Sequence, residues 1–438
     1  MLREYQTEAV QSALRSDNGI IVLPTGSGKS HVIAALVNAT HGNSIILQPT
    51  KEILESNFEK IQALGISDVS IYSASMNSKR LSKATYATIG SIIKIKDQLK
   101  GTELLIIDEA HLTNAKGGQY LDLIESIKPE KIIGLTATPY RLYSNSFGST
   151  VRILTRTRPK IWKDIVHVTQ SSDLIKQGFL IQPKFEVSGI DTGKLLGSNT
   201  TGADYSDYSI GRYSRQTNLP SRIVDAVRQA VNQGLAHILI FISTLQENDS
   251  VVYSLKNLGV TADSVSGMST KSERENKLKS FRNGEIRAMV NVGILTTGYD
   301  FPRLDCIIGA RPTMSLALYY QMIGRCVRPH PDKHQAVVFD LVNNFGKFGN
   351  PFSMMVVRGK TGLYSVLSPT GRLTGRTIDA VPEMMDVIEF GKYKGSYLKD
   401  VPINYMEWWL ENVKKDSVWH MFDSEIIRRK LFSSEVKN

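Results

Sequence analysis

The stretch "VLPTGSGKSHV", residues 22–32, joins an apolar segment to a helical one through a glycine-rich turn. "NGII" leads into it and "VIAALVNA" follows it, so the expected order is strand, loop, helix. In this setting, backbone N–H groups and a helix N-terminus form a cradle for phosphates. Lys29 is placed to reach the β and γ phosphates, and the Ser30 hydroxyl to ligate Mg²⁺. The stretch predicts a nucleotide phosphate site; the alternative is a glycine-rich turn with an exposed lysine.

The match of this loop to G-x-x-x-x-G-K-[ST] has one departure, since Leu23 stands where the first glycine belongs. The residues expected to surround the phosphates are Thr25, Gly26, Ser27 and Gly28.

Length and composition bound the class of protein. The 438 residues suffice for two or three domains at about 100–200 residues each, and only Cys306 and Cys326 are present, which excludes a disulfide framework or a four-thiolate zinc site. No apolar run is long enough to span a bilayer, and "MLREYQTEAV" at the start lacks the apolar core of a signal peptide. We therefore expect a soluble, cytoplasmic protein with no membrane partner. A net charge of +11 favours a polyanionic partner; the alternative is a basic protein with no nucleic-acid role.

The alternation of apolar strands with helical stretches divides the chain into parts. Residues 1–140 and 235–345 both show it, which favours two α/β lobes with mostly parallel sheets. Residues 141–234 are expected to form a connector and interlobe linker. Residues 346–438 are expected to form a C-terminal region with a small aromatic and basic module at about 386–412. The predicted strands are residues 19–24, 44–50, 70–74, 85–89, 104–110 and 131–139 in the first lobe, and 237–243, 262–267, 287–295, 306–311 and 336–342 in the second.

A second motif, "LLIIDEAH" at residues 104–111, ends an apolar strand with two carboxylates. In open α/β sheets, ligands bind beyond the carboxyl ends of the strands, so Asp108 is placed to hold Mg²⁺ directly or through water. Glu109 is placed to position and deprotonate the water that attacks a γ-phosphate. The alternative is a solvated acidic turn at a strand end.

Lys29 and Ser30, taken with the tetrapeptide DEAH at residues 108–111, resemble the superfamily 2 helicases of the DEAH-box kind. Phosphate loops of that family commonly lack the first glycine, which accounts for Leu23. The resemblance implies two tandem RecA-like lobes with ATP and Mg²⁺ bound in the cleft between them. The remaining motifs of the family follow in order and cover nearly all of residues 1–345.

The first-lobe motifs of the resemblance include one for adenine. "LREYQ" at residues 2–6 resembles the family's adenine-reading motif, which implies that Gln6 bonds to the adenine edge while Arg3 or Tyr5 packs near the base. Without its position before the phosphate loop, the same string is ordinary helix sequence.

A coupling motif ends the first lobe. "LTATPYR" at residues 135–141 resembles the segment that links the ATP site to the nucleic-acid track through Thr136 and Thr138. The resemblance implies that Thr136 and His111 exchange hydrogen bonds that depend on the nucleotide state. The alternative for each threonine is a buried hydroxyl satisfied by backbone.

The second lobe is expected to complete the ATP site. "YYQMIGRCVRP" places Gln321, Arg325 and Arg328 at spacings of four and three, on one face of a helix. Arginines that reach a phosphate chain from another domain contribute roughly 10³–10⁵ in rate. "ILTTGYDFP" resembles the family motif that precedes this segment, which implies that Gly298 and Asp300 approach the nucleotide and Arg325. For "YYQMIGRCVRP", the alternative is a surface helix with two arginines.

Several short motifs resemble the segments that grip a nucleic-acid backbone in this family: "QPTKEIL", "ATIGS", "FISTL" and the threonines at 296 and 297. They offer hydroxyl, ammonium or backbone N–H donors to phosphate oxygens. The alternative is a set of ordinary strand-to-helix turns. The residues implied are Thr50, Lys51, Thr88, Ser91, Ser243, Thr244 and Thr296, with Thr297 as the alternative to Thr296.

The segment 140–163 holds six basic side chains and no acidic one. Such a segment neutralises several phosphates and gives salt-sensitive binding. We expect an arm or hairpin that touches duplex or branched DNA through Arg152, Arg156 and Arg158. The alternative is a solvated connector between the lobes.

The C-terminal stretch "FGKYKGSYLKDVPINYMEWWLEN", residues 390–412, resembles a small module at the C-terminus of some exonucleases and phage proteins. Bases stack on aromatic rings and phosphates pair with lysines, so one interpretation is a nucleic-acid platform that includes Lys392 and Lys394. The other is a mini-domain core in which Tyr405, Trp408 and Trp409 are mostly buried.

The function expected from these motifs is an ATP-dependent DNA helicase or translocase. It most resembles compact phage-type helicases that remodel forks and branched DNA, and no obligate protein partner is evident. One alternative is an RNA helicase or RNP remodeller. Another is an ATP-gated clamp that binds branched DNA without moving.

Overall fold

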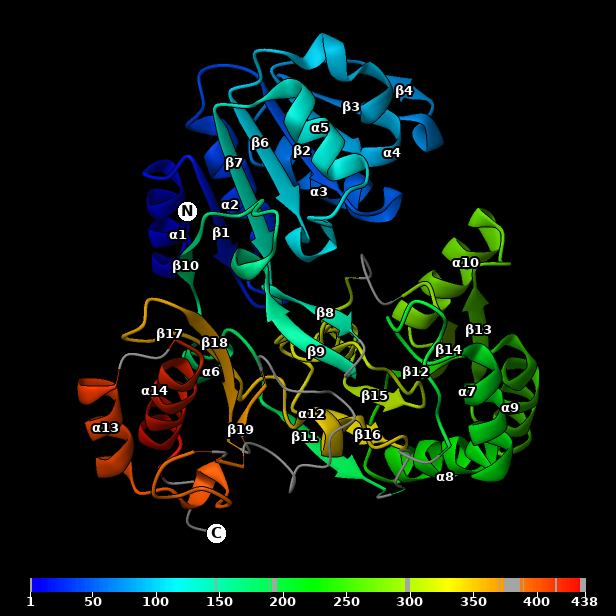
Figure 1. Ribbon diagram of the computed structural model, residues 1–438. Coiled ribbons are helices and arrows are strands. Elements are labelled where there is room, and N and C mark those ends of the chain that lie inside the picture. Colours follow the sequence, from blue (N-terminus) through cyan, green and yellow to red (C-terminus); the bar gives the residue numbers. More distant parts are fainter. Residues whose placement is uncertain are drawn as a thin grey trace.

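The computed structural model describes residues 2–145, 148–188, 190, 195–295, 300–369, 371–373, 387–388, 390–413 and 416–433. Two sheets of mainly parallel strands form two lobes, with a smaller C-terminal region beside them (Figure 1). The α/β class and the two-lobe architecture expected from the sequence are confirmed.

The first lobe is built on an eight-stranded sheet in the order β10-β1-β7-β6-β2-β5-β3-β4, parallel except for the short edge strand β4. Strands in its centre carry runs of consecutive apolar residues, such as the four that open β6, because helices bury both faces of a parallel sheet. Its strands are β1 (Asn18–Val22), β2 (Ser44–Gln48), β3 (Val69–Ser73), β4 (Ser78–Lys79), β5 (Ala84–Thr88), β6 (Leu104–Asp108), β7 (Lys131–Thr136) and β10 (Asp164–Val168). Its helices are α1 (Glu4–Leu14), α2 (Lys29–Asn38), α3 (Lys51–Ala63), α4 (Ile89–Ile92) and α5 (Gln119–Ile127), and the chain continues from β10 into α6 (Ser171–Lys176).

The second lobe is built on a six-stranded, fully parallel sheet in the order β11-β16-β15-β12-β14-β13. Its strands are β11 (Pro183–Val187), β12 (Ile238–Ile242), β13 (Ala262–Ser266), β14 (Ala288–Val292), β15 (Cys306–Gly309) and β16 (Ala336–Asp340). Its helices are α7 (Asp207–Gln216), α8 (Leu219–Asn232), α9 (Leu245–Asn257), α10 (Lys271–Arg282), α11 (Leu316–Ile323) and α12 (Asn344–Phe348).

The lobe boundaries expected at residues 140 and 235 need correction. β10 pairs with β1, so residues 164–168 belong to the first sheet. β11 pairs with β16, and helices α7 and α8 pack on the second core, so the second lobe begins near residue 183. Both misplaced strands lie at sheet edges, and their sequences, DIVHV and PKFEV, interrupt the apolar run with charged or polar residues, which gives a weak signal for a buried strand.

The start of the expected connector forms a two-stranded antiparallel ribbon, β8 (Tyr140–Asn145) and β9 (Gly148–Ile153). It leaves the first sheet directly after β7 and lies between the two lobes (Figure 1).

The C-terminal region contains a three-stranded antiparallel sheet followed by two helices. The sheet docks on the first lobe: Tyr364 Oη donates to the carbonyl of Ile165 in β10 at 2.8 Å, and Gln170 bonds to both backbone groups of Val356. None of the helices in the described ranges is long and apolar enough to cross a membrane. The elements are β17 (Met355–Arg358), β18 (Tyr364–Ser368), β19 (Gly371–Arg372), α13 (Ile403–Asn412) and α14 (Asp416–Leu431).

The aromatic module at residues 390–412 forms a core of its own with α14. Trp409 and Tyr405 pack against the buried Phe422, whereas Trp408 keeps half of its surface exposed. The core interpretation of these aromatic residues therefore holds for Tyr405 and Trp409, and Trp408 remains accessible.

His420 joins α14 to the C-terminal sheet and should make this region sensitive to acid. Its ring is buried, and Nε2 lies 3.1 Å from Ser365 Oγ. Burial, with the nearby charges of Arg372 and Arg156, lowers the pKa of His420 from 6.5 to about 4. As pH falls, His420 is protonated in the unfolded chain before it is protonated in the folded protein. The free energy of unfolding therefore decreases between the unfolded and folded pKa values, by about 2 kcal/mol from about pH 7 to pH 5.

The measurement is urea unfolding at both pH values, followed by tryptophan fluorescence, which reports on this region because three of the four tryptophans are Trp408, Trp409 and Trp419. We expect His420→Gln to show a smaller loss of stability than the wild type, and the exposed control His334→Gln to match the wild type. An equal loss in wild type and His420→Gln would contradict this assignment.

Candidate nucleotide site between the lobes

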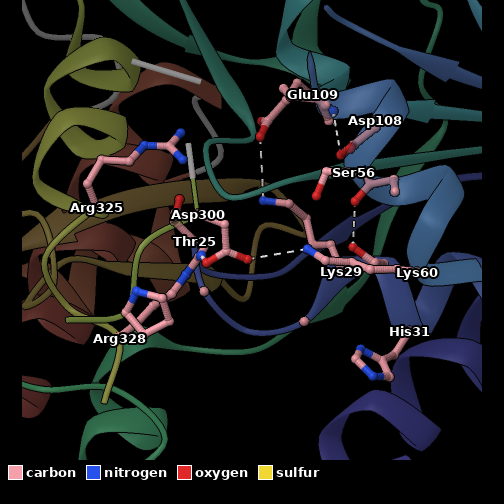
Figure 2. A pocket seen from close by; sticks show the side chains of 16 residues that line it. Thr25, Lys29, His31, Ser56, Lys60, Asp108, Glu109, Asp300, Arg325 and Arg328 are labelled. Carbon is pink, nitrogen blue, oxygen red and sulfur yellow. Dashed lines mark hydrogen bonds and ion pairs between the residues drawn. The ribbon is translucent and has the colours of Figure 1, made fainter. Parts of the chain in front are cut away.

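A cavity of about 350 Å³ lies where the two lobes face each other. The carboxyl ends of β1 and β6 supply one wall, and the loop after α11 supplies another. Figure 2 shows Lys29, Asp108 and Glu109 on one side, and Arg325 and Arg328 on the other. The lining residues are Thr25, Gly26, Gly28, Lys29, Ser30, His31, Ile53, Ser56, Asn57, Lys60, Asp108, Glu109, Asp300, Pro302, Arg325 and Arg328.

The glycine-rich loop has the backbone that a phosphate cradle requires. Gly26 and Gly28 have φ of 85° and 81°, a region that glycine adopts without strain. A Cβ at Gly28 would lie 2.7 Å from Gln6 Nε2 and would be strained at this positive φ, so the position favours glycine. Helix α2 begins at Lys29, which directs its N-terminal N–H groups and its positive dipole end toward this loop.

Residues expected to read adenine hold the loop in place instead. Tyr5 Oη and Gln6 Nε2 both donate to the carbonyl of Ser27, at 2.7 and 2.9 Å. The Gln6 Oε1 atom accepts from the backbone N–H of Arg3. The adenine role of Gln6 therefore stays a prediction, since it requires these bonds to be exchanged.

Arg3 lies over the ring of Phe179 at 3.8 Å, which places a cation and an aromatic ring beside the loop. Both residues line a second cavity of about 540 Å³ that adjoins α1. Phe179 follows α6, and it had no signal in the sequence because it lies far along the chain from the motif that it meets.

The two carboxylates at the end of β6 differ in protonation. Burial, followed by the charge of Glu109, raises the pKa of Asp108 to about 7. Burial also raises the pKa of Glu109, but the charges of Lys29 and Arg325 outweigh this and hold it below its usual range. Glu109 is therefore ionised at neutral pH, and its Oε1 lies 3.6 Å from Lys29 Nζ. An ionised carboxylate beside this cavity can accept a proton from water.

The residues expected to hold Mg²⁺ suit that ion. Asp108 and Ser30 line the same cavity, and Asp108 is a buried carboxylate whose charge is not fully compensated, as its raised pKa indicates. Mg²⁺ is usually held by one or two carboxylates together with substrate phosphates and waters. Ser30 Oγ here donates to Asn57 Oδ1 at 2.7 Å, so its hydroxyl is held in the cavity.

The arginines come from the second lobe and stay charged. α11 ends at Ile323, so both arginines lie in the loop after the helix that was expected to carry them. Burial lowers the pKa of Arg325 and of Arg328 to about 10, so both are cations at neutral pH. Asp300 forms ion pairs with Arg328 and, across the lobes, with Lys60 at 3.3 Å. The lobes are therefore already joined by charge at this cavity.

Two features of the site were missed in the sequence. Lys333 is buried and donates to the carbonyls of Cys326, Arg328 and Pro302, which ties the arginine loop to the loop after Asp300. Four lining residues, Ile53, Ser56, Asn57 and Lys60, share one face of α3. Their spacing of three, one and three residues was a helical signal that could have found them.

His111 connects the first-lobe wall of the cavity to the second lobe. Its Nδ1 atom lies 3.0 Å from Thr136 Oγ1 and 3.2 Å from Thr138 Oγ1, so the expected contact between Thr136 and His111 is present. Its Nε2 atom lies 3.3 Å from Gln321 Nε2. Burial lowers the pKa of His111, so the ring is neutral at neutral pH. Since an amide nitrogen only donates, Nε2 accepts from Gln321 and the ring proton is on Nδ1.

Replacing Gln321 by leucine should uncouple the two sides of the cavity. The substitution removes the donor to His111, and removal of a buried hydrogen bond costs about 1 kcal/mol, or roughly a fivefold change in rate. We expect nucleic-acid-stimulated ATP turnover to fall about fivefold with little change in ATP affinity. Steady-state ATPase assays measure both, with the exposed Gln229→Leu on α8 as the control. Turnover equal to that of the control would contradict this role.

Some expected nucleic-acid contacts are engaged within the protein. Thr50 caps α3 by accepting from the N–H of Ile53, and Lys51 Nζ donates to the carbonyl of Ser75. Ser91 Oγ accepts from Thr88 Oγ1 and from the N–H of Ala74.

In the second lobe, Ser243 Oγ is buried, and no partner for it is found in the described part of the chain. Thr244 is the N-cap of α9. Both lie directly after β12, and their contact with nucleic acid stays a prediction. The predicted site residues Thr296, Thr297 and Gly298 lie outside the described residues.

Two family models match this chain. Residues 1–141 match the "Type III restriction enzyme, res subunit" family, and residues 222–330 match "Helicase conserved C-terminal domain". The first contains the phosphate loop, Asp108 and Glu109. The second contains Gln321 and both arginines.

Curated relatives include "51.5 kDa protein" of a Lactococcus phage, 26% identical over 76% of this chain and 67% of its own length. "Putative mitochondrial ATP-dependent helicase irc3" of Schizosaccharomyces pombe is 27% identical over 78% of this chain and 57% of its own length. "DNA 3'-5' translocase XPB2" of Sulfurisphaera tokodaii is 26% identical, with 78% and 81% covered. Proteins named as RNA helicases also match. The chain thus spans about half to two thirds of the length of the first curated relatives that it matches.

Among solved structures, a fragment of a putative HsdR subunit of a type I restriction enzyme from Vibrio vulnificus has a TM-score of 0.60 at 18% identity. The match covers 80% of this chain and 66% of that one, and at this identity it supports the fold. The cavity lies between the two matched domains, and motif residues of both domains line it. The chain belongs to the superfamily 2 helicases.

Proposed function

We propose that this protein is an ATP-dependent motor that moves along DNA and remodels forks and branched DNA. One observation carries the proposal: Lys29, Glu109, Arg325 and Arg328 line one cavity although they come from two lobes. A hydrolytic site divided in this way is completed only when the lobes are together. Each turnover is thereby linked to their closing and opening.

The residues of the cavity have separate tasks in hydrolysis. Lys29 and the N–H groups of its loop bind the β and γ phosphates of ATP. Glu109 orients the attacking water and accepts its proton as the bond to the γ-phosphorus forms and the bond to the ADP oxygen breaks. Arg325 and Arg328 offset the negative charge that develops on the transferred group. Asp108 and Ser30 would hold Mg²⁺, which would supply further neutralisation of the phosphate oxygens.

Movement follows if each lobe holds a different phosphate of one strand. The residues for this grip are Thr50, Lys51, Thr88 and Ser91 in the first lobe, and Ser243, Thr244 and Thr296 in the second. The tetrapeptide at 108–111, with its link from His111 to Gln321, supports assignment to the DEAH-box kind and supplies a path from nucleotide state to lobe position.

The choice of DNA rests on similarity. The matched translocase of S. tokodaii is named for DNA, and the first lobe matches a restriction-enzyme family. The net charge of +11 suits any nucleic acid.

Strand displacement on labelled substrates tests the proposal. The wild type should displace strands from a DNA fork and from a four-way junction only when ATP and Mg²⁺ are present, and Lys29→Ala should not. Displacement confined to RNA duplexes would instead indicate an RNA helicase. Nucleotide-dependent binding to DNA without displacement or sustained turnover would indicate a clamp.

A further inference from the structure

The ribbon β8–β9 has one apolar face and one basic, aromatic face. Side chains of a strand alternate between faces, and the register pairs Tyr140 with Ile153, Arg141 with Arg152, Leu142 with Val151 and Tyr143 with Thr150. Tyr140, Val151 and Ile153 are buried, and Leu142 packs against the same core. The opposite face therefore carries Arg141, Arg152, Tyr143 and Thr150.

The apolar face fixes the ribbon to the second lobe. Strand β8 lies against α11, and Tyr140 and Tyr320 line one small cavity between them. Since α11 leads directly to Arg325, the ribbon rests on the helix that positions the arginine side of the ATP site.

The ribbon is also bonded to the first lobe. The Arg141 guanidinium donates to the carbonyl of Thr113, and Trp162 Nε1 donates to Thr113 Oγ1 at 3.0 Å. Thr113 lies two residues beyond His111. The ribbon thus contacts segments that lead to both sides of the nucleotide cavity.

The outer face gathers cations around one ring. The Arg152 guanidinium lies 3.8 Å from the centre of the Tyr143 ring, and Lys116 Nζ lies 5.2 Å from it. A guanidinium that stacks through its flat face keeps the N–H donors at its edge available for bidentate bonds to phosphate. Lys116 is exposed, on the loop that follows Thr113.

Acidic residues in the described part of the chain do not balance the charges of Arg152 and Lys116. Across residues 2–145, 148–188 and the other described ranges, neither side chain forms an ion pair with a carboxylate. The ribbon even places Arg141 directly opposite Arg152, an arrangement that destabilises an antiparallel pair. A polyanion bound on this face offsets that repulsion.

We propose that Lys116, Tyr143 and Arg152 form a contact surface for the phosphodiester backbone of a nucleic-acid strand. Arg152 and Lys116 bind the phosphates, and Tyr143 is a positioning residue that holds the Arg152 guanidinium flat. This proposal rests on the proposed function as a nucleic-acid motor, and it names a surface that lies outside the paired grip motifs of the two lobes. Arg141 and α11 connect this surface to the two sides of the ATP site, so a bound nucleic-acid strand can influence that site through them.

The test is the affinity for a single-stranded DNA oligonucleotide, measured by fluorescence anisotropy between about 50 and 200 mM salt. For Lys116→Ala with Arg152→Ala, we expect weaker binding and a slope of log affinity against log salt that is shallower by about 1.4, because each single-strand phosphate that the protein neutralises contributes about 0.7 to the slope. The control is Arg15→Ala, an exposed arginine at the end of α1 that lies at the opposite, amino edge of the sheet.

Two variants at Tyr143 separate positioning from general damage. Tyr143→Phe keeps the ring and should bind with the slope and affinity of the wild type. Tyr143→Ala releases Arg152 and should weaken binding, and adding Arg152→Ala to it should then cost less than in the wild type. Thermal unfolding temperatures equal to that of Arg15→Ala establish that the variants are folded.

Failure of this surface and failure of the motor give different results. If the wild type binds DNA in a salt-dependent manner but the Lys116 and Arg152 variants match Arg15→Ala, the surface assignment is wrong and the motor assignment stands. If the wild type binds neither DNA nor RNA at any salt concentration, the motor assignment fails and this surface fails with it.

Discussion

Replacing Arg325 by alanine is expected to lower the rate of ATP turnover by a factor of about 10³ or more, with a much smaller change in ATP affinity. Arg325 reaches the cavity from the second lobe, is buried, and remains a cation although burial lowers its pKa to about 10. Its charge acts mainly on the transition state, where negative charge accumulates on the transferred phosphoryl group.

Steady-state turnover with saturating DNA, together with binding of a fluorescent ATP analogue, separates the rate from the affinity. Arg325→Lys should not restore the rate, because a lysine lacks the planar fork that binds two phosphate oxygens. Arg303→Ala is the matched control, since this exposed arginine of the same lobe pairs with Asp332. Turnover by Arg325→Ala within tenfold of the control would remove Arg325 from the catalytic site.

Replacing Glu109 by glutamine is expected to lower turnover by a factor of about 10²–10⁴ while ATP binding is retained. The substitution preserves shape but removes the carboxylate that accepts the proton of water. It also removes the ion pair with Lys29 at 3.6 Å, so the lysine is freer to bind phosphate. The variant should therefore accumulate in an ATP-bound, DNA-bound state.

Filter binding of radiolabelled ATP in the presence of DNA detects that state, and the exposed Glu125→Gln on α5 is the control. Rapid turnover by Glu109→Gln would refute its role with water. Loss of ATP binding would show instead that Glu109 is needed to hold the loop.

The sequence predicted the cavity well because its chemistry is local. The phosphate loop, the acidic strand end and the arginine segment after α11 each fit within about ten consecutive residues, and parallel strands bring their carboxyl ends to one edge. All eleven strands predicted in the two lobes are present. That the first-lobe and second-lobe residues form one site was expected from the family resemblance alone. In the structure, residues of both lobes line the same cavity.

The features that the sequence did not predict depend on contacts between distant segments. Phe179 meets Arg3, Lys333 holds the arginine loop, and Gln6 holds Ser27 rather than standing free for a base. None of these residues has a neighbour that signals its role. β10 and β11 fall within the expected connector because charged and polar residues interrupt their apolar pattern, and only the pairing with β1 and β16 shows where they belong.

The basic segment 140–163 illustrates a partial success. Composition indicated an arm, and the hairpin register then separated its side chains into a buried face and a basic face. Composition alone did not distinguish Arg152, which stacks on Tyr143, from Arg141, which is bonded to Thr113. Arg156 and Arg158 follow the ribbon and are exposed, so their contact with DNA remains a prediction.

The most direct test of the central claim is steady-state ATPase activity with single-stranded DNA, duplex DNA, a fork, a four-way junction and single-stranded RNA, with Lys29→Ala as the blank. We expect strong stimulation by DNA, greatest with branched forms, and none in the blank. Stimulation by RNA alone would contradict the choice of DNA, and turnover indifferent to every nucleic acid would contradict the motor itself.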